Sequence, residues 1–151
     1  MGEKALISLH PVGWVANGVT GPKHQGWEEV ESEIVIEPEL APALKGLEDY
    51  SHILILFWLD RVSPEEKAML QFRPHDREDL PLLGAFATRS QRRPNPIGLT
   101  VVKLLGREGN RLRVMGLDAL DGTPVLDIKP YSHHDYVEGF VGPEWLRRAR
   151  S

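Results

Sequence analysis

Three arginines, two prolines and a glycine lie close together in one segment of the chain, residues 86–100, with the sequence FATRSQRRPNPIGLT. Proline holds its φ at about −65° and keeps the preceding residue out of the helical region. Residues 93–96 (RPNP) are therefore expected to form a stiff, extended corner, and Gly98 permits close backbone approach just beyond it. Guanidinium groups on a rigid loop bind carboxylate or phosphate groups. The segment therefore predicts a site for an anionic ligand.

Three other short segments carry groups that can contribute to the same site. Residues 20–25 (TGPKHQ) form a short cationic loop, and residues 120–123 (LDGT) form a tight turn with a carboxylate and free backbone amides. In a strand, residues two apart share a face, so Asp127 and Lys129 are expected on one side of their segment. The Asp-Gly turn taken alone is more simply a hairpin. The combination of these segments with the arginine loop favours a binding site.

The histidines and the cysteine count give little support for a metal or thiol site. His133 and His134 are followed by Asp135, but adjacent side chains in an extended segment point apart, so an ordinary polar loop is the simpler interpretation. The chain has no cysteine, which excludes disulfides, thiolate metal ligands and a cysteine nucleophile. We therefore expect no metal.

Charge is distributed unevenly along the chain. The net charge of −4 alone argues mildly against nucleic acid as a partner. Residues 25–50, however, hold eight acidic side chains and one basic side chain, whereas residues 85–113 hold seven basic and one acidic. Such a chain can present a basic face to a polyanion despite its overall sign.

The hydrophobic pattern indicates short strands with few helices. Residues 52–59 form a nearly continuous apolar run, typical of a strand buried on both faces. Ser63 followed by Pro64 predicts a short helix with a serine cap, and a second short helix is expected near residues 38–46 and a third at the C-terminal end. Too few helices separate the strands for a βαβ or Rossmann arrangement, so the expected fold is mainly β, a single antiparallel barrel. The expected strands are residues 6–15, 30–36, 52–59, 84–88, 99–105, 112–117 and 125–128.

Length and composition predict one domain, residues 1–151, because 151 residues with 41% hydrophobic content suffice for one core. The chain lacks an apolar run of membrane-spanning length, lacks a secretory signal pattern, and is therefore expected to be cytoplasmic and not bound to a membrane.

Two long strings make the sequence recognisable. Residues 87–100 (ATRSQRRPNPIGLT) and residues 121–131 (DGTPVLDIKPY) resemble the TrmO/TsaA-like, or YaeB-like, family, and Tyr50-Ser51-His52 matches that family's entry to its long apolar strand. The resemblance runs from about Val12 to Tyr136. Several members carry a further C-terminal domain, whereas this chain stops soon after the last motif, so it resembles a short form.

The resemblance implies a homodimeric, S-adenosylmethionine-dependent tRNA methyltransferase built on one β-barrel. The activity it implies is methylation of the exocyclic amine of threonylcarbamoyl-adenosine, the base immediately 3′ of certain anticodons. The family's Pro-Arg-Gln cofactor loop corresponds to Pro22-Lys23-His24, and Asp60 and Arg61 stand where the family often has histidine and a polar residue. The cofactor-binding candidates are Pro22, Lys23, His24, Asp60, Arg61, Arg89, Leu99, Leu120, Asp121, Gly122 and Thr123.

The chemistry of the same residues suggests how each group is used. Arg89 can bind the cofactor carboxylate bidentately, the amides of Gly122 and Thr123 can contact the adenine edge, and Asp121 or Asp60 can accept from the ammonium or ribose. Asp127, Lys129 and Tyr131 are the catalytic candidates, for orienting the target base. Arg92, Arg93 and the arginines of the tail are hypothesised to contact tRNA phosphates. Two alternatives remain: a methyltransferase acting on a small molecule or protein, and a non-catalytic module that binds S-adenosylmethionine.

Overall fold

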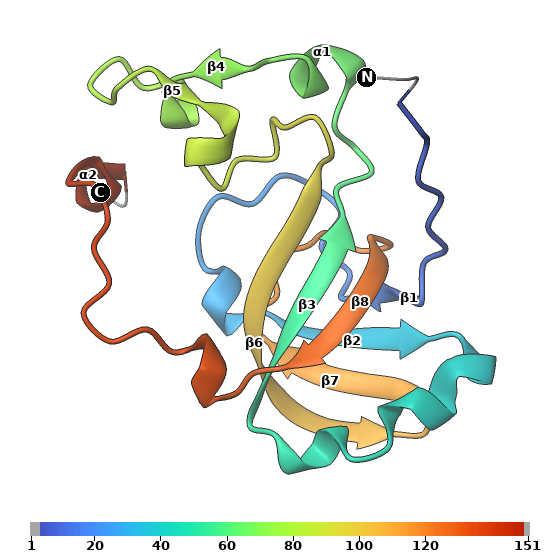
Figure 1. Cartoon of the computed structure of the whole chain (residues 1–151). Coiled ribbons are helices and arrows are strands. Elements are labelled where there is room, and N and C mark those ends of the chain that lie inside the picture. The colour runs from blue at the N-terminus through green and yellow to red at the C-terminus, as the bar shows by residue number, and fades with distance from the viewer. Residues whose placement is uncertain (1–3, 150–151) are drawn as a thin grey trace.

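Six strands form a closed antiparallel barrel in the computed structural model, which describes residues 4–149 (Figure 1). Each strand pairs with its neighbours around the barrel, and β8 returns to β1 to close it. This confirms the expected mainly β fold. In barrel order the strands are β1 (Gly13–Ala16), β2 (Glu31–Ile36), β7 (Arg111–Met115), β6 (Ile97–Glu108), β3 (His52–Trp58) and β8 (Pro124–Pro130).

The apolar strand β3 alternates between the barrel interior and its outer face. Ile53, Ile55 and Phe57 are buried, whereas Leu54 and Leu56 are only half-buried. The prediction that this strand is buried on both faces was therefore wrong. The strand belongs to a small barrel, in which one face fills the core and the other faces outward. The continuous apolar run thus makes both a core and an apolar outer surface.

The first strand is shorter than the sequence pattern indicated. Of the residues 6–15 expected to form it, only residues 13–15 lie in a strand, because β1 spans Gly13–Ala16. The first backbone hydrogen bond among the described residues runs from the Val12 amide to the Val125 oxygen. Leu6 is 98% exposed and Ile7 is 85% exposed. Strand-forming side chains are insufficient where no neighbouring strand supplies hydrogen bonds.

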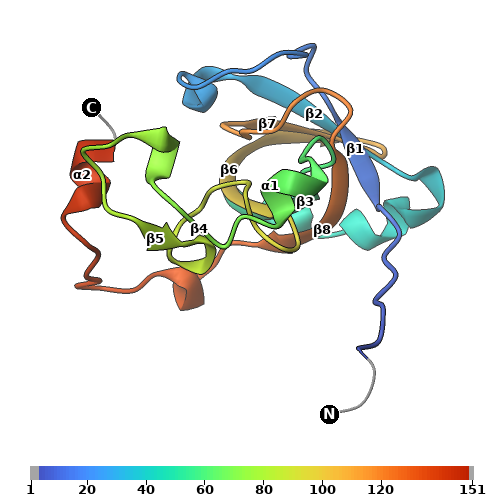
Figure 2. The ribbon, with the colours of Figure 1, turned by 90° about the horizontal axis from the view of Figure 1, so that it is seen from above.

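A small lobe lies at the end of the barrel where β3 ends, and the C-terminal helix lies beside the outer part of this lobe (Figure 1 and Figure 2). The lobe contains α1 (Pro64–Lys67) and a two-stranded sheet of β4 (Gln71–Phe72) and β5 (Leu83–Gly84). Ser63 caps α1 by accepting from the Glu66 amide, as expected for serine before Pro64. The terminal helix α2 spans Trp145–Ala149, which confirms the third expected helix.

Several connections are 3₁₀ turns rather than strands or α-helix. The expected strand at residues 84–88 is mostly such a turn, because the Thr88 amide and hydroxyl both donate to the Ala85 oxygen. The expected helix at residues 38–46 is also 3₁₀. These turns are η1 (Trp27–Glu29), η2 (Pro38–Leu44), η3 (Leu47–Asp49), η4 (Pro74–Asp76), η5 (Ala85–Ala87) and η6 (His133–Asp135). Within residues 4–149, every helix is too short or too polar to span a lipid bilayer.

Candidate functional site

A cavity of about 530 Å³ opens where β3 ends and β6 begins. It is lined by residues from both faces of the first part of β6 and by the arginine loop that precedes this strand. Two guanidinium groups, one amide and one carboxylate share it with apolar side chains. The lining residues are Phe57, Leu59, Arg89, Gln91, Arg93, Ile97, Gly98, Leu99, Thr100 and Asp118.

Gly98 and Phe57 form the wall of this cavity. They face each other directly in the register of β3 and β6. A Cβ on Gly98 would lie 2.4 Å from two carbons of the Phe57 ring, closer than any real contact. The absence of a side chain at Gly98 therefore lets Phe57 close the core at the mouth of the barrel.

The arginine loop is held in place by its own main chain. Arg89 donates from Nη2 to the Leu99 main-chain oxygen at 2.7 Å, which joins two of the cofactor-binding candidates. Arg93 donates from Nη1 to the main-chain oxygens of Thr88 and Ser90, at 3.1 and 2.9 Å. The two guanidinium groups are therefore oriented toward one cavity before any ligand enters it, an arrangement suited to an anionic group.

Asp118 brings a carboxylate to the same cavity. It follows β7 in the connection to β8, and it accepts a short hydrogen bond at Oδ1 from the Thr100 hydroxyl of β6. Neither residue was predicted from the sequence as part of the site. The only available signal was that Asp118 stands two residues before the Leu120-Asp121-Gly122-Thr123 turn.

The amides of that turn are already used inside the fold. Gly122 donates to the Val15 oxygen at 2.7 Å and Thr123 to the Leu120 oxygen at 3.1 Å. The expectation of free amides was therefore wrong, because the turn is tied to β1 and to itself. The Asp121 carboxylate accepts from the amides of Asn17 and Gly18, and these two bonds hold its pKa below the usual value. Asp121 thus fastens the turn to the loop after β1.

Arg61 links two of the predicted segments. Its guanidinium donates to the main-chain oxygens of Thr20 and Asp121, each at 3.1 Å. The loop that begins at Thr20 includes the candidates Pro22, Lys23 and His24. The main-chain oxygen of Lys23 accepts a hydrogen bond from the Trp27 indole at 2.9 Å. Asp60 is exposed and makes no hydrogen bond or ion pair within residues 4–149. Of the eleven cofactor-binding candidates, Arg89 and Leu99 line the cavity.

The catalytic candidates lie outside that cavity. Lys129 pairs with Asp127 at 3.1 Å, which confirms that the two share a face of β8. Leu56 of β3 pairs with Asp127 of β8 on one side and with Leu99 of β6 on the other. Asp127 and Leu99 therefore occupy the same outer face of the barrel, about 10 Å apart, which is two strand spacings. Tyr131 follows β8 and donates its amide to the His52 oxygen.

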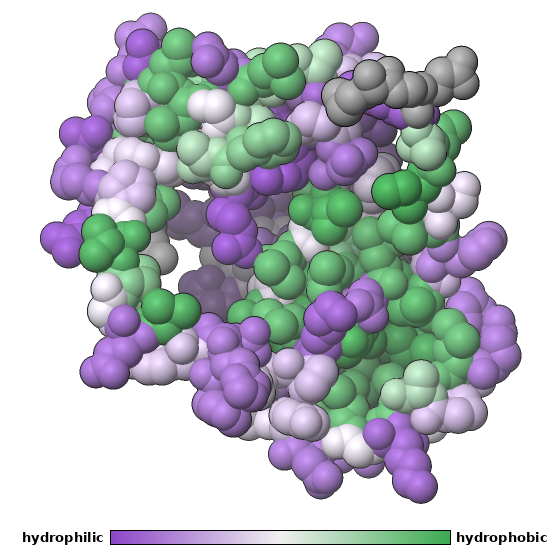
Figure 3. Space-filling model, viewed as in Figure 1, coloured by the Kyte–Doolittle hydropathy of each residue, from purple (hydrophilic) through white to green (hydrophobic). Residues whose placement is uncertain are grey.

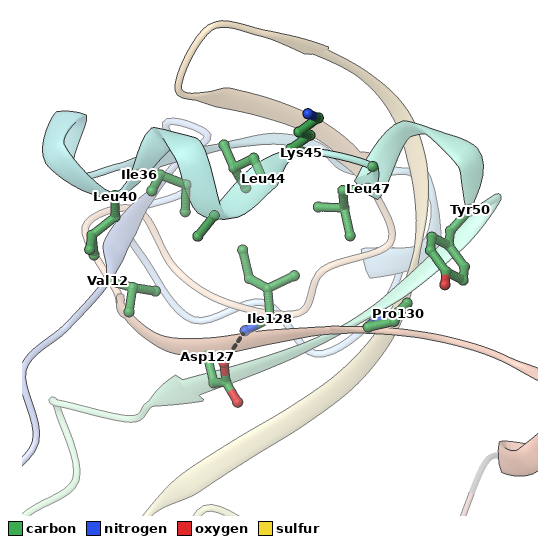
Figure 4. A pocket seen from close by; sticks show the side chains of 12 residues that line it. Val12, Ile36, Leu40, Leu44, Lys45, Leu47, Tyr50, Asp127, Ile128 and Pro130 are labelled. Carbon is green, nitrogen blue, oxygen red and sulfur yellow. Dashed lines mark hydrogen bonds between the residues drawn. The ribbon is translucent and has the colours of Figure 1, made fainter.

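A second cavity, of about 470 Å³, lies near the opposite end of β3 (Figure 4). Figure 4 shows Ile128 directed toward Leu44 and Leu47, whereas the Asp127 carboxylate lies on the other side of β8. Asp127 also accepts from the Ile128 amide at 2.9 Å. This cavity is mainly apolar, and it lacks the paired guanidinium groups of the first one.

The Arg92 side chain binds to residues of the lobe. It makes two hydrogen bonds of 2.7 Å to the Asp76 carboxylate and stacks over the Phe72 ring at 5.4 Å. The bonds from Arg92 hold the pKa of Asp76 below its ordinary value. Arg92 therefore fixes the lobe, so a contact between this side chain and phosphate requires that pairing to open.

Known proteins resemble this chain over most of its length. Residues 19–135 match the model of the tRNA-methyltransferase O N-terminal domain. The chain belongs to this TrmO family.

Within residues 4–149, no group of three His, Cys, Asp or Glu side chains is arranged to hold a metal ion.

This chain covers different shares of the length of its relatives. A "Probable S-adenosyl-L-methionine-binding protein" of Archaeoglobus fulgidus is 48% identical over 95% of this chain, which spans 39% of that relative. A second protein of the same organism, described as an S-adenosyl-L-methionine-binding protein, is 42% identical over 82% of this chain and 88% of its own length. A crystal structure of TrmO from Pseudomonas aeruginosa matches with a TM-score of 0.73 at 33% identity, covering 93% of this chain and 63% of that one. This chain thus spans less than two thirds of both the first relative and the solved TrmO.

Proposed function

We propose that this chain binds S-adenosylmethionine in the 530 Å³ cavity and transfers its methyl group to tRNA. The observation that carries this proposal is the cavity itself, where Arg89 is held by Leu99 beside Arg93 and Asp118. The family match supports it, because the matched domain is that of a tRNA methyltransferase. The relatives named for S-adenosylmethionine binding support the choice of cofactor.

The residues present fit the chemical groups of the cofactor. Its carboxylate can take two parallel hydrogen bonds from the Arg89 guanidinium, whose Nη2 is already positioned by Leu99. Leu99, which lines the cavity, can cover a face of the adenine. Arg61 would act from outside, by holding the Thr20 loop and the Asp121 turn together.

When bound, S-adenosylmethionine would supply an activated methyl group: the attacking nitrogen would form a bond to the methyl carbon as the carbon–sulfur bond breaks, the sulfur would keep the electron pair and leave as S-adenosylhomocysteine, and the nitrogen would lose its proton to water. The barrier of such a displacement falls chiefly through alignment of the reacting atoms. The rigid arginine loop and the Phe57 wall serve that alignment, because they fix where the cofactor lies relative to β6.

We propose that the target is the exocyclic amine of threonylcarbamoyl-adenosine next to the anticodon. Asp127, Lys129 and Tyr131 would orient that base. Their position supports this role, because Asp127 and Lys129 lie on the outer barrel face that also carries Leu99. Arg93, Arg147 and Arg148 would contact tRNA phosphates; Arg150, the third arginine of the tail, lies outside the described residues.

We further propose that the working form is a cytoplasmic homodimer. Ile97, Leu99 and Val101 on β6 are 40, 43 and 46% exposed, and they continue the apolar outer face of β3. Figure 3 shows apolar side chains gathered on this side of the molecule and an open gap between the barrel and the C-terminal segment. Large apolar areas of this kind are typical of protein interfaces, and a second copy would cover them.

The proposed activity can be tested with labelled methyl transfer. Wild type, Arg89→Ala and Arg111→Ala are incubated with S-adenosylmethionine and total tRNA from a strain without its own family member, followed by nucleoside mass analysis. Arg111 is the matched control, because it is an exposed arginine paired with Glu33 on β2. We expect a new methyl on threonylcarbamoyl-adenosine with wild type and Arg111→Ala, and little with Arg89→Ala.

Two other outcomes would change the proposal. If wild type binds the cofactor but labels no nucleoside of that tRNA, the substrate is a different nucleophile or the chain is a binding module. If wild type does not bind S-adenosylmethionine, both the proposed cofactor and the proposed reaction are wrong.

A further inference from the structure

Asp118 is the one carboxylate among the ten described residues that line the cavity. Two guanidinium groups line the same space, yet Asp118 forms no ion pair within residues 4–149. The cavity therefore offers two cationic groups and one separate anionic group. A ligand that carries both a carboxylate and a positive charge complements this arrangement.

Thr100 fixes the orientation of the Asp118 carboxylate. Its hydroxyl, on the inward face of β6, donates to Oδ1 of Asp118. Thr100 faces buried Ile55 across the sheet, so its β-branched side chain has little rotamer freedom. One oxygen of Asp118 is thereby held by the barrel, and the second remains to accept from a ligand.

The other candidate carboxylates nearby are already used. Asp121 accepts from the amides of Asn17 and Gly18. Asp127 pairs with Lys129 on the outer face of β8. Neither lines the cavity that contains Arg89. The role that the sequence suggested for Asp121, accepting from the cofactor ammonium, is better suited to Asp118.

We infer that Asp118 binds the α-ammonium group of S-adenosylmethionine, opposite the carboxylate held by Arg89, and that Thr100 is its positioning residue. This inference rests on the proposed function. The ammonium donates to the Oδ2 atom of Asp118, while Thr100 holds Oδ1. Together, Arg89 and Asp118 recognise the zwitterionic amino-acid end of the cofactor and fix its direction in the cavity.

Calorimetry with three ligands tests the assignment. S-adenosylmethionine and S-adenosylhomocysteine both carry the ammonium, whereas methylthioadenosine lacks the whole amino-acid end. Asp118→Asn is expected to weaken binding of the first two by about tenfold or more and to leave the third unchanged. Asp49→Asn is the matched control and should leave all three unchanged, because Asp49 is an exposed residue of η3 whose carboxylate makes no hydrogen bond or ion pair within residues 4–149.

Thr100 is tested by a double-mutant comparison. As a single variant, Thr100→Val is expected to weaken the binding of S-adenosylhomocysteine. In the Asp118→Asn background the same substitution should cause little further loss of affinity. Thr100→Ser should retain binding. Thermal denaturation of each variant separates loss of binding from loss of folding.

Several outcomes would overturn the assignment. If Asp118→Asn binds S-adenosylmethionine as tightly as wild type, Asp118 does not contact the cofactor. If the variant loses affinity for S-adenosylmethionine but not for S-adenosylhomocysteine, Asp118 contacts the sulfonium. If it loses affinity for methylthioadenosine equally, Asp118 contacts the adenosine. Failure of wild type to bind any of the three would instead remove the proposed function itself.

Discussion

Arg89 and Leu99 are joined by a hydrogen bond of 2.7 Å from the guanidinium Nη2 to the main-chain oxygen. The two residues are ten positions apart, and the prolines between them turn the chain so that the arginine loop folds back on the start of β6. The bond holds the guanidinium group at the cavity that Arg89 lines. A side chain that is positioned before binding loses less conformational freedom when the ligand arrives.

Replacing Arg89 by lysine should therefore be nearly as harmful as replacing it by alanine. Lysine keeps the charge but cannot donate to Leu99 and bind a carboxylate bidentately at the same time. We expect both variants to bind S-adenosylmethionine about tenfold or more weakly, measured by calorimetry. Full affinity in Arg89→Lys would show that charge alone matters at this position.

Replacing Arg61 should loosen the site without unfolding the barrel. Arg61→Ala removes the two bonds that link the Thr20 loop to the Asp121 turn, but the side chain is exposed. The expected loss of stability is about 1 kcal/mol or less, with a several-fold loss of cofactor affinity. Urea unfolding and calorimetry on the same sample measure both. Unchanged affinity would mean that the two loops do not contribute to the site.

Gly98→Ala should destabilise the protein, because the new Cβ meets the Phe57 ring. Overpacking of this kind costs about 1 to 3 kcal/mol, measured by urea unfolding. Gly21→Ala is the matched control, since a Cβ there meets nothing within 4 Å. Equal stability of the two variants would show that Phe57 moves away without penalty.

Asp121 should make stability depend on pH. Its pKa is lowered from 3.8 by the Asn17 and Gly18 amides, so its contribution to folding is present above the unfolded-state pKa and is lost as the pH falls through the folded-state value. The difference in melting temperature between wild type and Asp121→Ala should thus be constant near neutral pH and shrink below about pH 4. A difference that stays constant from pH 7 to pH 2 would contradict this role for the carboxylate.

The outer face of β6 should control assembly. Val101 is 46% exposed and faces Leu54 outside the barrel. Val101→Glu places a charge in the proposed dimer contact, and sedimentation is expected to show a dimer for wild type and a monomer for the variant. Lys103→Glu, exposed two residues further along β6, is a charge-changing comparison on the same strand. A monomer for wild type at micromolar concentration would remove the homodimer.

The sequence allowed the barrel to be predicted because strand-forming residues and turns recur at short intervals. The capped helix after Ser63 is a local feature of the sequence, and the structure confirms it. Local pattern could not tell that the apolar run of β3 faces outward on one side. That distinction depends on closure of the barrel, which is a property of all six strands.

The candidate site was predicted only in part for a related reason. Arg89 and Leu99 stand in one recognisable string, and they lie together in the structure. Asp118 and Thr100 are eighteen positions apart and meet only through the packing of β6 against β7. The Gly122 amide was expected to be free because its acceptor, the Val15 oxygen, lies over a hundred residues away in the chain.

A crystal structure of the protein with S-adenosylhomocysteine would locate the ligand. We expect it between β6 and the loop after β7, with its carboxylate on Arg89 and its ammonium on Asp118. A ligand seated instead in the apolar cavity beside Leu47 and Ile128 would contradict this expectation.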